Sequence, residues 1–70
     1  MNLALLRTEA HVLLDDIWRK GIVKRSNCYK ILSRTYGKNY HIGEANLEEL
    51  EDLIRRLKIW RVQLGLPNGS

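Results

Sequence analysis

Apolar residues recur at the spacing of an α-helix in three separate segments of this chain, and no alternation typical of a β-strand runs for a useful length. In the first segment they form one broad face, and the segment closes with Arg19 and Lys20 followed by Gly21. Cations in a last turn complement the helix dipole, and a glycine directly after it is a frequent stop. The sequence therefore predicts a first helix from about Leu3 to Lys20.

A second, shorter helix is predicted, with Ser26 as its N-cap and its end before Gly37. Serine is a favoured N-cap residue, and glycine is favoured directly beyond a helix end. Lys30 and Arg34 lie on its polar face. Its apolar side comprises Cys28, Ile31, Leu32 and Tyr36, with Tyr29 at the edge.

The third helix carries a capping-box signal, because Glu49 follows Asn46 by three positions. Acidic residues crowd its first turns and basic residues its later turns, which suits the helix dipole. Pro67 is expected to end it. The ion pairs expected along it are Glu51–Arg55 and Asp52–Arg56. Its predicted buried stripe comprises Leu47, Leu50, Leu53, Ile54, Leu57, Trp60 and Leu64.

The expected fold is therefore all-α, a small three-helix bundle that forms one domain over residues 1–66, with a flexible C-terminal tail at 67–70. A domain of this size buries only about 60% of the surface of its unfolded chain, so its stability is marginal. The single cysteine, Cys28, excludes an internal disulfide. Two alternatives stay open: a bundle that is stable by itself, or one supported by a partner or by assembly into a homodimer.

No run of about 18 apolar residues is present, and the N-terminal residues lack the basic start and apolar stretch of a secretory signal. We therefore expect no membrane partner. A lone thiol is compatible with the reducing cytosol, so the expected location is cytoplasmic.

A segment of 27 residues between Asp16 and Glu44 contains no acidic side chain, although it holds seven of the twelve Lys and Arg residues. With a net charge of +4, such a chain favours anionic partners. Phosphate contacts from this segment would give affinity with little sequence information. In the alternative interpretation, the cations form a solvated face that the acidic residues of the third helix balance. The residues predicted to bind nucleic acid are Lys20, Lys24, Arg25, Lys30, Arg34 and Lys38.

The same segment holds four of the five aromatic residues, and these have two interpretations. Tyr36 or Tyr40 would stack on bases if their rings were exposed. Aromatic residues at helical spacing more often pack in the core, and Trp18, Tyr29 and Tyr36 fit that description.

Four apolar residues depart from the predicted buried stripes. Leu5 and Val12 lie on the opposite face of the first helix, and Ile59 and Val62 leave the stripe of the third. Isolated exposed apolar side chains are ordinary. Two such pairs in a short chain indicate a protein interface or a homodimer contact, which is the alternative to scattered surface residues.

Arg7, His11 and Asp15 stand four residues apart along the first helix. A carboxylate four residues from an imidazole could orient it as a general base, but such pairs more often tie a helix surface. The spacing of His11, Cys28 and His41 matches no zinc motif. We therefore expect no catalytic site, no metal and no cofactor, and the role of these polar residues, structural or functional, stays open.

A distinctive order of residue types runs over about fifty residues and is made up of Arg7, Ala10, His11, Asp15 or Asp16, Trp18, Arg25, Tyr29, His41, Ile42 and Gly43. It resembles the C-terminal helical part of a family of phage and prophage zinc-finger-containing proteins. Members carry an Arg, an Ala-His, an Asp and a Trp on one helix, an Arg and a Tyr at the next, and a His-Ile-Gly before a third. The cysteine-bearing zinc ribbon of that family has no counterpart in this chain. The resemblance implies a phage or mobile-element origin and a helical module without the metal of the ribbon.

The leading functional hypothesis is a non-enzymatic binding protein whose basic central surface contacts nucleic acid without strong sequence readout. The alternative is a protein–protein effector, an inhibitor or adaptor that docks on a host or defence protein, including one that itself handles nucleic acid. In that case the cations would meet an acidic surface of the host protein.

Overall fold

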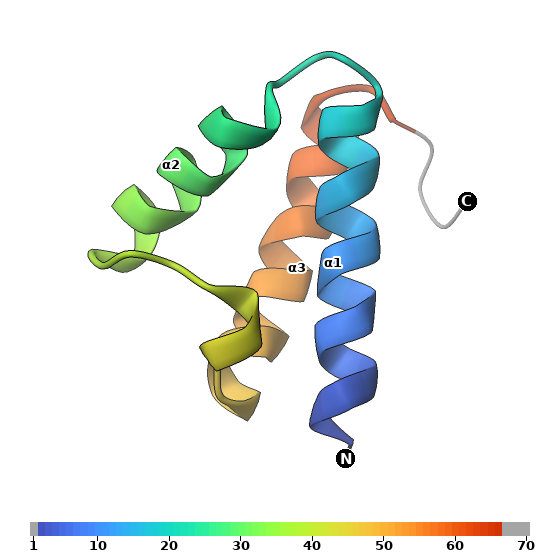
Figure 1. Ribbon diagram of the computed structural model, residues 1–70. Coiled ribbons are helices and arrows are strands. Elements are labelled where there is room, and N and C mark those ends of the chain that lie inside the picture. Colours follow the sequence, from blue (N-terminus) through green and yellow to red (C-terminus); the bar gives the residue numbers. More distant parts are fainter. Residues whose placement is uncertain (1, 67–70) are drawn as a thin grey trace.

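Three helices and one short turn of 3-10 helix make up the fold, which is taken from a computed structural model that describes residues 2–66. They are α1 (Leu3–Arg19), α2 (Arg25–Tyr36), η1 (Ile42–Glu44) and α3 (Leu47–Gln63). Figure 1 shows α1 and α3 side by side and running in the same direction, while α2 returns in the opposite sense and inclines away from them. The described residues contain no strand, so the predicted all-α bundle of three helices is confirmed.

The first helix is close to its prediction. The side chain of Asn2 caps its start by accepting a hydrogen bond from the backbone N–H of Ala4 at 2.9 Å. At the other end Lys20 is the C-cap, and Gly21 follows as the predicted stop. The helical segment is thus one residue shorter than expected.

The start of α2 differs from the prediction, since the helix begins at Arg25 and Lys24, not Ser26, is its N-cap. The side chain of Lys24 makes no capping hydrogen bond, but its carbonyl accepts the backbone N–H of Cys28 at 3.0 Å. Burial of Cys28 and Leu32 therefore sets the helix start here, and it outweighs the capping preference of serine. The predicted end before Gly37 is confirmed.

The capping box of α3 is confirmed in both directions. The backbone N–H of Glu49 donates to the Asn46 side chain at 2.9 Å, and the Asn46 N–H donates to the Glu49 carboxylate at 3.5 Å. The helix ends at Gln63, ahead of Gly65, whose φ of 78° breaks the helical path. Pro67 and the predicted tail at 67–70 lie outside the described residues.

One core joins the three helices and the segment before α3. Its buried apolar residues are Ala10, Leu14, Ile17, Cys28, Leu32, Tyr40, Ile42, Ala45, Leu50, Leu53, Ile54 and Leu57. The prediction that Leu47 and Ile31 belong to the core is wrong, because Leu47 is 41% exposed and Ile31 is 42% exposed. Leu47 is the first residue of α3, at the open end of the bundle, and Ile31 borders a groove that the inclination of α2 leaves beside α3.

A buried ion pair ties α1 to α3. The guanidinium of Arg61 donates to the carboxylate of Asp16, and the Arg61 side chain is only 2% exposed. The hydrogen bond from Arg61 holds the pKa of Asp16 below its ordinary value. This contact joins the C-terminal halves of α1 and α3, and the Arg7–Ala45 hydrogen bond joins α1 to the chain just before α3 begins.

None of the helices within residues 2–66 combines the length and the hydropathy that a membrane-spanning segment requires.

Candidate functional site

A groove of about 690 Å³ lies where α2, the middle of α1 and the segment before η1 meet. We call it the basic groove. Its volume falls within the range typical of small-molecule sites, roughly 300–1,000 Å³. The residues that line it are His11, Arg25, Ser26, Tyr29, Lys30, Ser33, Arg34, Asn39, Tyr40, His41, Ile42 and Gly43. Within residues 2–66, no Asp or Glu contributes to this lining.

One face of α2 forms the longest wall of the basic groove. Arg25, Tyr29 and Ser33 are spaced four apart along it, and so are Lys30 and Arg34. Side chains at this spacing lie on the same side of a helix, one turn above another. Lys30 and Arg34 are exposed, and within the described part of the chain neither enters a salt bridge. Their charge is therefore available to a ligand in the groove.

Arg25 is held by aromatic rings. Its guanidinium carbon lies 5.2 Å from the centroid of the Tyr29 ring and 6.0 Å from that of Trp18, both within cation–π range. The indole N–H of Trp18 in turn donates to the carboxylate of Asp15 at 2.9 Å. These contacts limit the rotamers of the Arg25 side chain. Its guanidinium therefore loses less conformational entropy when it binds a ligand in the groove.

Both histidines of the chain reach the same groove, one from each side. His11 comes from α1, and His41 is the N-cap residue of η1. The Nδ1 atom of His11 lies 3.0 Å from the backbone carbonyl oxygen of Arg7. Since a carbonyl only accepts, this contact assigns the proton to Nδ1 and leaves Nε2 as the acceptor of the neutral ring.

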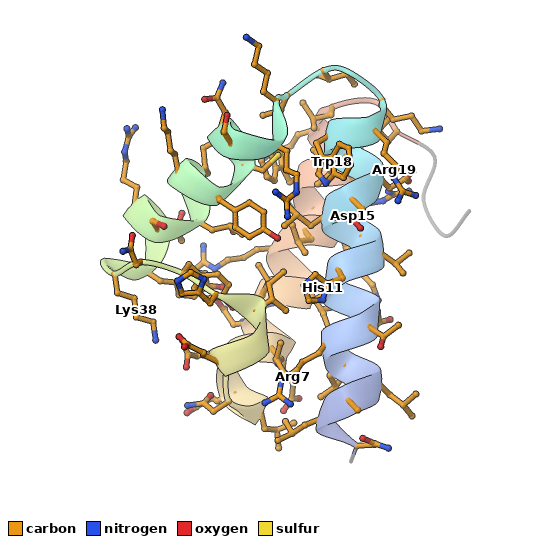
Figure 2. The ribbon with its side chains drawn as sticks, viewed as in Figure 1. Arg7, His11, Asp15, Trp18, Arg19 and Lys38 are labelled. Atoms are coloured by element: carbon orange, nitrogen blue, oxygen red, sulfur yellow. The ribbon has the colours of Figure 1, made fainter. Side chains whose placement is uncertain are left out.

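The predicted row of Arg7, His11 and Asp15 follows one side of α1, with Trp18 beyond it (Figure 2). The three side chains have separate partners. The Arg7 guanidinium donates to the carbonyl of Ala45 at 3.4 Å, His11 bonds the backbone of its own helix, and Asp15 accepts from Trp18. Arg7 thus ties α1 to Ala45, the residue after η1, while His11 and Asp15 bond within α1, and of the three only His11 lines the basic groove.

Three of the six predicted nucleic-acid-binding cations lie outside the groove lining. Lys20 and Lys24 are exposed at the connection between α1 and α2. Lys38 lies two residues beyond the end of α2, away from α1 (Figure 2). Its ammonium group is 2.8 Å from the carboxylate of Glu49, and this hydrogen bond holds the pKa of Glu49 below its ordinary value.

Among the acidic residues at the start of α3, Asp52 is bonded by arginines of its own helix. Asp52 accepts hydrogen bonds from Arg55 and from Arg56, each at 2.7 Å. The predicted Asp52–Arg56 pair is confirmed, but Arg55 bonds Asp52 in place of its predicted partner Glu51. These bonds, with one from Tyr36, lower the pKa of Asp52 to about 2. Of the six predicted cations, Lys38 alone meets these carboxylates in a salt bridge among residues 2–66.

The two tyrosines expected to stack on bases stack on each other. The rings of Tyr36 and Tyr40 have centroids 4.6 Å apart and planes inclined by 21°. Tyr40 is 3% exposed, and burial raises its pKa to about 12. The Tyr36 hydroxyl donates to Asp52 at 2.8 Å, and burial followed by this contact raises its pKa well above the ordinary value. The Tyr40 ring is therefore closed to a base, and Tyr40 covers one face of the Tyr36 ring, which does not line the groove. Tyr29 is half-buried and does line it.

The four predicted interface residues, Leu5, Val12, Ile59 and Val62, are each more than half exposed. Cys28 is buried in the core, where desolvation raises the pKa of its thiol. No group of three or more His, Cys, Asp or Glu side chains that could hold a metal ion gathers among the residues that the structure describes.

The charge pattern of the sequence did not indicate several lining residues, among them Ser26, Ser33 and Asn39. It also did not indicate that both histidines line one groove. One sequence signal does coincide with the groove. Many positions that carry the resemblance described above line it: His11, Arg25, Tyr29, His41, Ile42 and Gly43. Trp18, another of these positions, lies under Arg25.

Comparison of the chain with protein-family models, with curated proteins and with solved structures finds no match in any of the three.

Proposed function

We propose that this chain is a small non-enzymatic binding protein of phage or mobile-element origin, which contacts nucleic acid in the host cytoplasm through the basic groove. The observation that carries the proposal is the composition of this groove. Arg25, Lys30, Arg34 and both histidines line it, and no carboxylate of the described residues does. A concave surface lined by one sign of charge focuses its field and attracts ions of the opposite sign.

Phosphate is the anion that these side chains suit. Arg25 presents a planar fork that matches two phosphate oxygens, while Lys30 and Arg34 add charge one turn apart. Phosphate contacts position a nucleic acid without reading its sequence. We therefore expect weak binding of duplex DNA at physiological salt, with a Kd in the range of about 10⁻⁴ to 10⁻⁶ M.

The test is fluorescence anisotropy with a random-sequence duplex, measured from about 50 to about 200 mM salt. Over this range, counterion release makes binding to phosphates strongly dependent on salt. The double variant Lys30→Glu/Arg34→Glu should abolish measurable binding. The matched control, Lys20→Glu/Lys58→Glu, makes the same change of net charge at exposed positions outside the groove lining. It should lower affinity only a few-fold, through the general field.

Unchanged duplex affinity of the Lys30→Glu/Arg34→Glu variant would contradict the proposal that nucleic acid binds in the basic groove. Equal losses in this variant and in the control would assign the binding to net charge and not to the groove. Wild-type affinity should also weaken with salt, so that log Kd rises by about 0.9 per log unit of salt concentration for each phosphate contacted.

A second candidate function, docking on a host protein as an inhibitor or adaptor, is favoured by the exposure of Leu5, Val12, Ile59 and Val62. Its test is a pull-down from nuclease-treated bacterial lysate. One protein recovered at stoichiometric yield by the wild type and by Lys30→Glu/Arg34→Glu, but not by Val12→Asp/Ile59→Asp, would support the effector. Loss in the Lys30→Glu/Arg34→Glu variant alone would instead indicate an acidic surface that binds the basic groove.

A further inference from the structure

The basic groove is lined by rings as well as by cations. Tyr29 comes from α2, His11 from α1 and His41 from the segment before η1, so the rings reach the groove from three parts of the chain. Both histidine side chains are exposed and the Tyr29 ring is half-buried. Asn39, also exposed, adds an amide with donor and acceptor atoms. A site for phosphate alone needs none of these rings.

We infer that the basic groove receives a single-stranded segment of nucleic acid, with one unpaired base among these rings and the neighbouring phosphates on the cations of α2. The inference rests on the proposed function and adds to it the class of nucleic acid. Cationic grooves with aromatic side chains are the usual means of holding single strands, because every base has a face that stacks.

The rings of the groove separate single strands from duplexes. In a duplex the bases are stacked inside, and what meets a protein is a convex backbone with base edges recessed in its grooves. Such a rod presents its phosphates to the cations of this open groove but offers no unpaired base to its rings. The basic groove has about 690 Å³ of space, which is enough to admit a splayed base with its sugar.

The cations that line this space all come from α2, which forms one wall of it. Lys30 and Arg34 extend from exposed positions one helical turn apart, a distance of about 5.4 Å along the axis. Arg25 lies at the first turn of the same helix with its guanidinium over Tyr29. This arrangement lets phosphates follow α2 while a base turns inward toward the histidines.

His11 supplies a directed polar contact within the groove. Because Nδ1 faces the carbonyl of Arg7, Nε2 is the atom left for a ligand. In the neutral ring Nε2 accepts a hydrogen bond from the amino or imino group of a base, and after protonation it donates to a phosphate. The contact to a base requires a nucleotide that is not already paired.

The experiment measures anisotropy with labelled dodecamers of single-stranded DNA, single-stranded RNA and hairpin duplex at one salt concentration. Single strands should bind on the order of tenfold more tightly than the duplex, because stacking adds to the phosphate contacts. His41→Ala should lower single-strand affinity several-fold and leave duplex affinity within about twofold. Tyr29→Leu also removes a ring that holds Arg25, so it should lower both affinities, that for single strands by the larger factor. The DNA and RNA arms show whether the 2′-hydroxyl contributes.

Ile31→Ala is the matched control, since Ile31 is exposed on α2 but does not line the basic groove. Tyr29 is half-buried, so circular dichroism must show Tyr29→Leu folded, and the exposed His41 gives a second variant without that concern. A single-strand affinity that neither variant changes would refute the inference that a base lies in the groove.

Equal affinity for single strands and duplex, lost in both cases by Lys30→Glu/Arg34→Glu, would refute this inference and leave the proposed function standing. No binding to any of the oligonucleotides would refute both.

Discussion

Tyr36 and Tyr40 stack on each other, yet their hydroxyl groups have opposite environments. The Tyr36 hydroxyl donates to Asp52 at 2.8 Å. The Tyr40 hydroxyl is buried, and no hydrogen-bond partner for it lies among residues 2–66. Replacing each tyrosine by phenylalanine keeps the ring stack and removes only the hydroxyl. The two variants should therefore change stability with opposite signs.

The magnitudes follow from the cost of the hydrogen bonds. A bond to a charged acceptor contributes about 1.5–3 kcal/mol, and partial exposure of this one reduces the expected loss in Tyr36→Phe to about 1–2 kcal/mol. A buried hydroxyl without a partner costs about 1–3 kcal/mol, so Tyr40→Phe should be neutral or stabilising by up to about 1 kcal/mol. In a domain of this size, 1 kcal/mol corresponds to a shift in Tm of about 4–8 °C.

Thermal and urea unfolding, followed by circular dichroism, measure both variants against the wild type. Tyr36→Phe should lower Tm by about 5–15 °C, and Tyr40→Phe should leave it unchanged or raise it by a few degrees. A Tyr40→Phe variant destabilised as much as Tyr36→Phe would show that the Tyr40 hydroxyl is paired in solution. That result would refute the reasoning from the two environments.

The remaining predictions concern pH, a helix cap and a turn. The pKa of Asp52 is about 2 in the folded chain against an ordinary value of 3.8, so the stability that its pairing contributes is complete above about pH 4 and is lost as the pH falls toward 2. Urea midpoints from pH 6 to 2 should show this decline, and Tyr36→Phe, which lacks one of the bonds, should show less of it. Asn46→Ala removes the side-chain acceptor of the capping box and should cost about 1 kcal/mol in urea unfolding, while an unchanged midpoint would contradict the role of the cap. Gly37 has a φ of 69°, and a methyl group added there would meet no neighbouring atom within 4 Å, so Gly37→Ala should cost about 1 kcal/mol from backbone strain alone. Gly43→Ala, equally unobstructed but without a positive φ, is its control and should be close to neutral.

Local signals predicted the helices well. The stop at Gly37 and the capping box at Asn46 involve residues a few positions apart, so the sequence contains all of the interaction. The prediction of Ser26 as a cap failed because the start of α2 is set by which residues reach the core. Ile31 was placed in the core because periodicity gives the apolar side of a helix but not the angle at which the helix leaves its neighbours.

The basic groove could be predicted only in part. Charge pattern indicated Arg25, Lys30 and Arg34, because they share a short helix. His11 and His41 are thirty positions apart and meet the groove only through the packing of η1 against α1. The sequence around each histidine gives no indication that the two line the same groove.

The distribution of carboxylates gives the groove its character. Asp16 pairs with Arg61 between α1 and α3, Asp15 accepts from Trp18, and Asp52 pairs with arginines of its own helix. Each of these contacts stabilises the bundle, and none places a carboxylate in the groove lining, although Asp52 also accepts a hydrogen bond from Tyr36 of α2. The acids nearest to the central cations in the sequence therefore do not neutralise the groove. Folding leaves Arg25, Lys30 and Arg34 around a space without a carboxylate of the described residues, and this supports the proposal that an anionic ligand supplies the counter-charge.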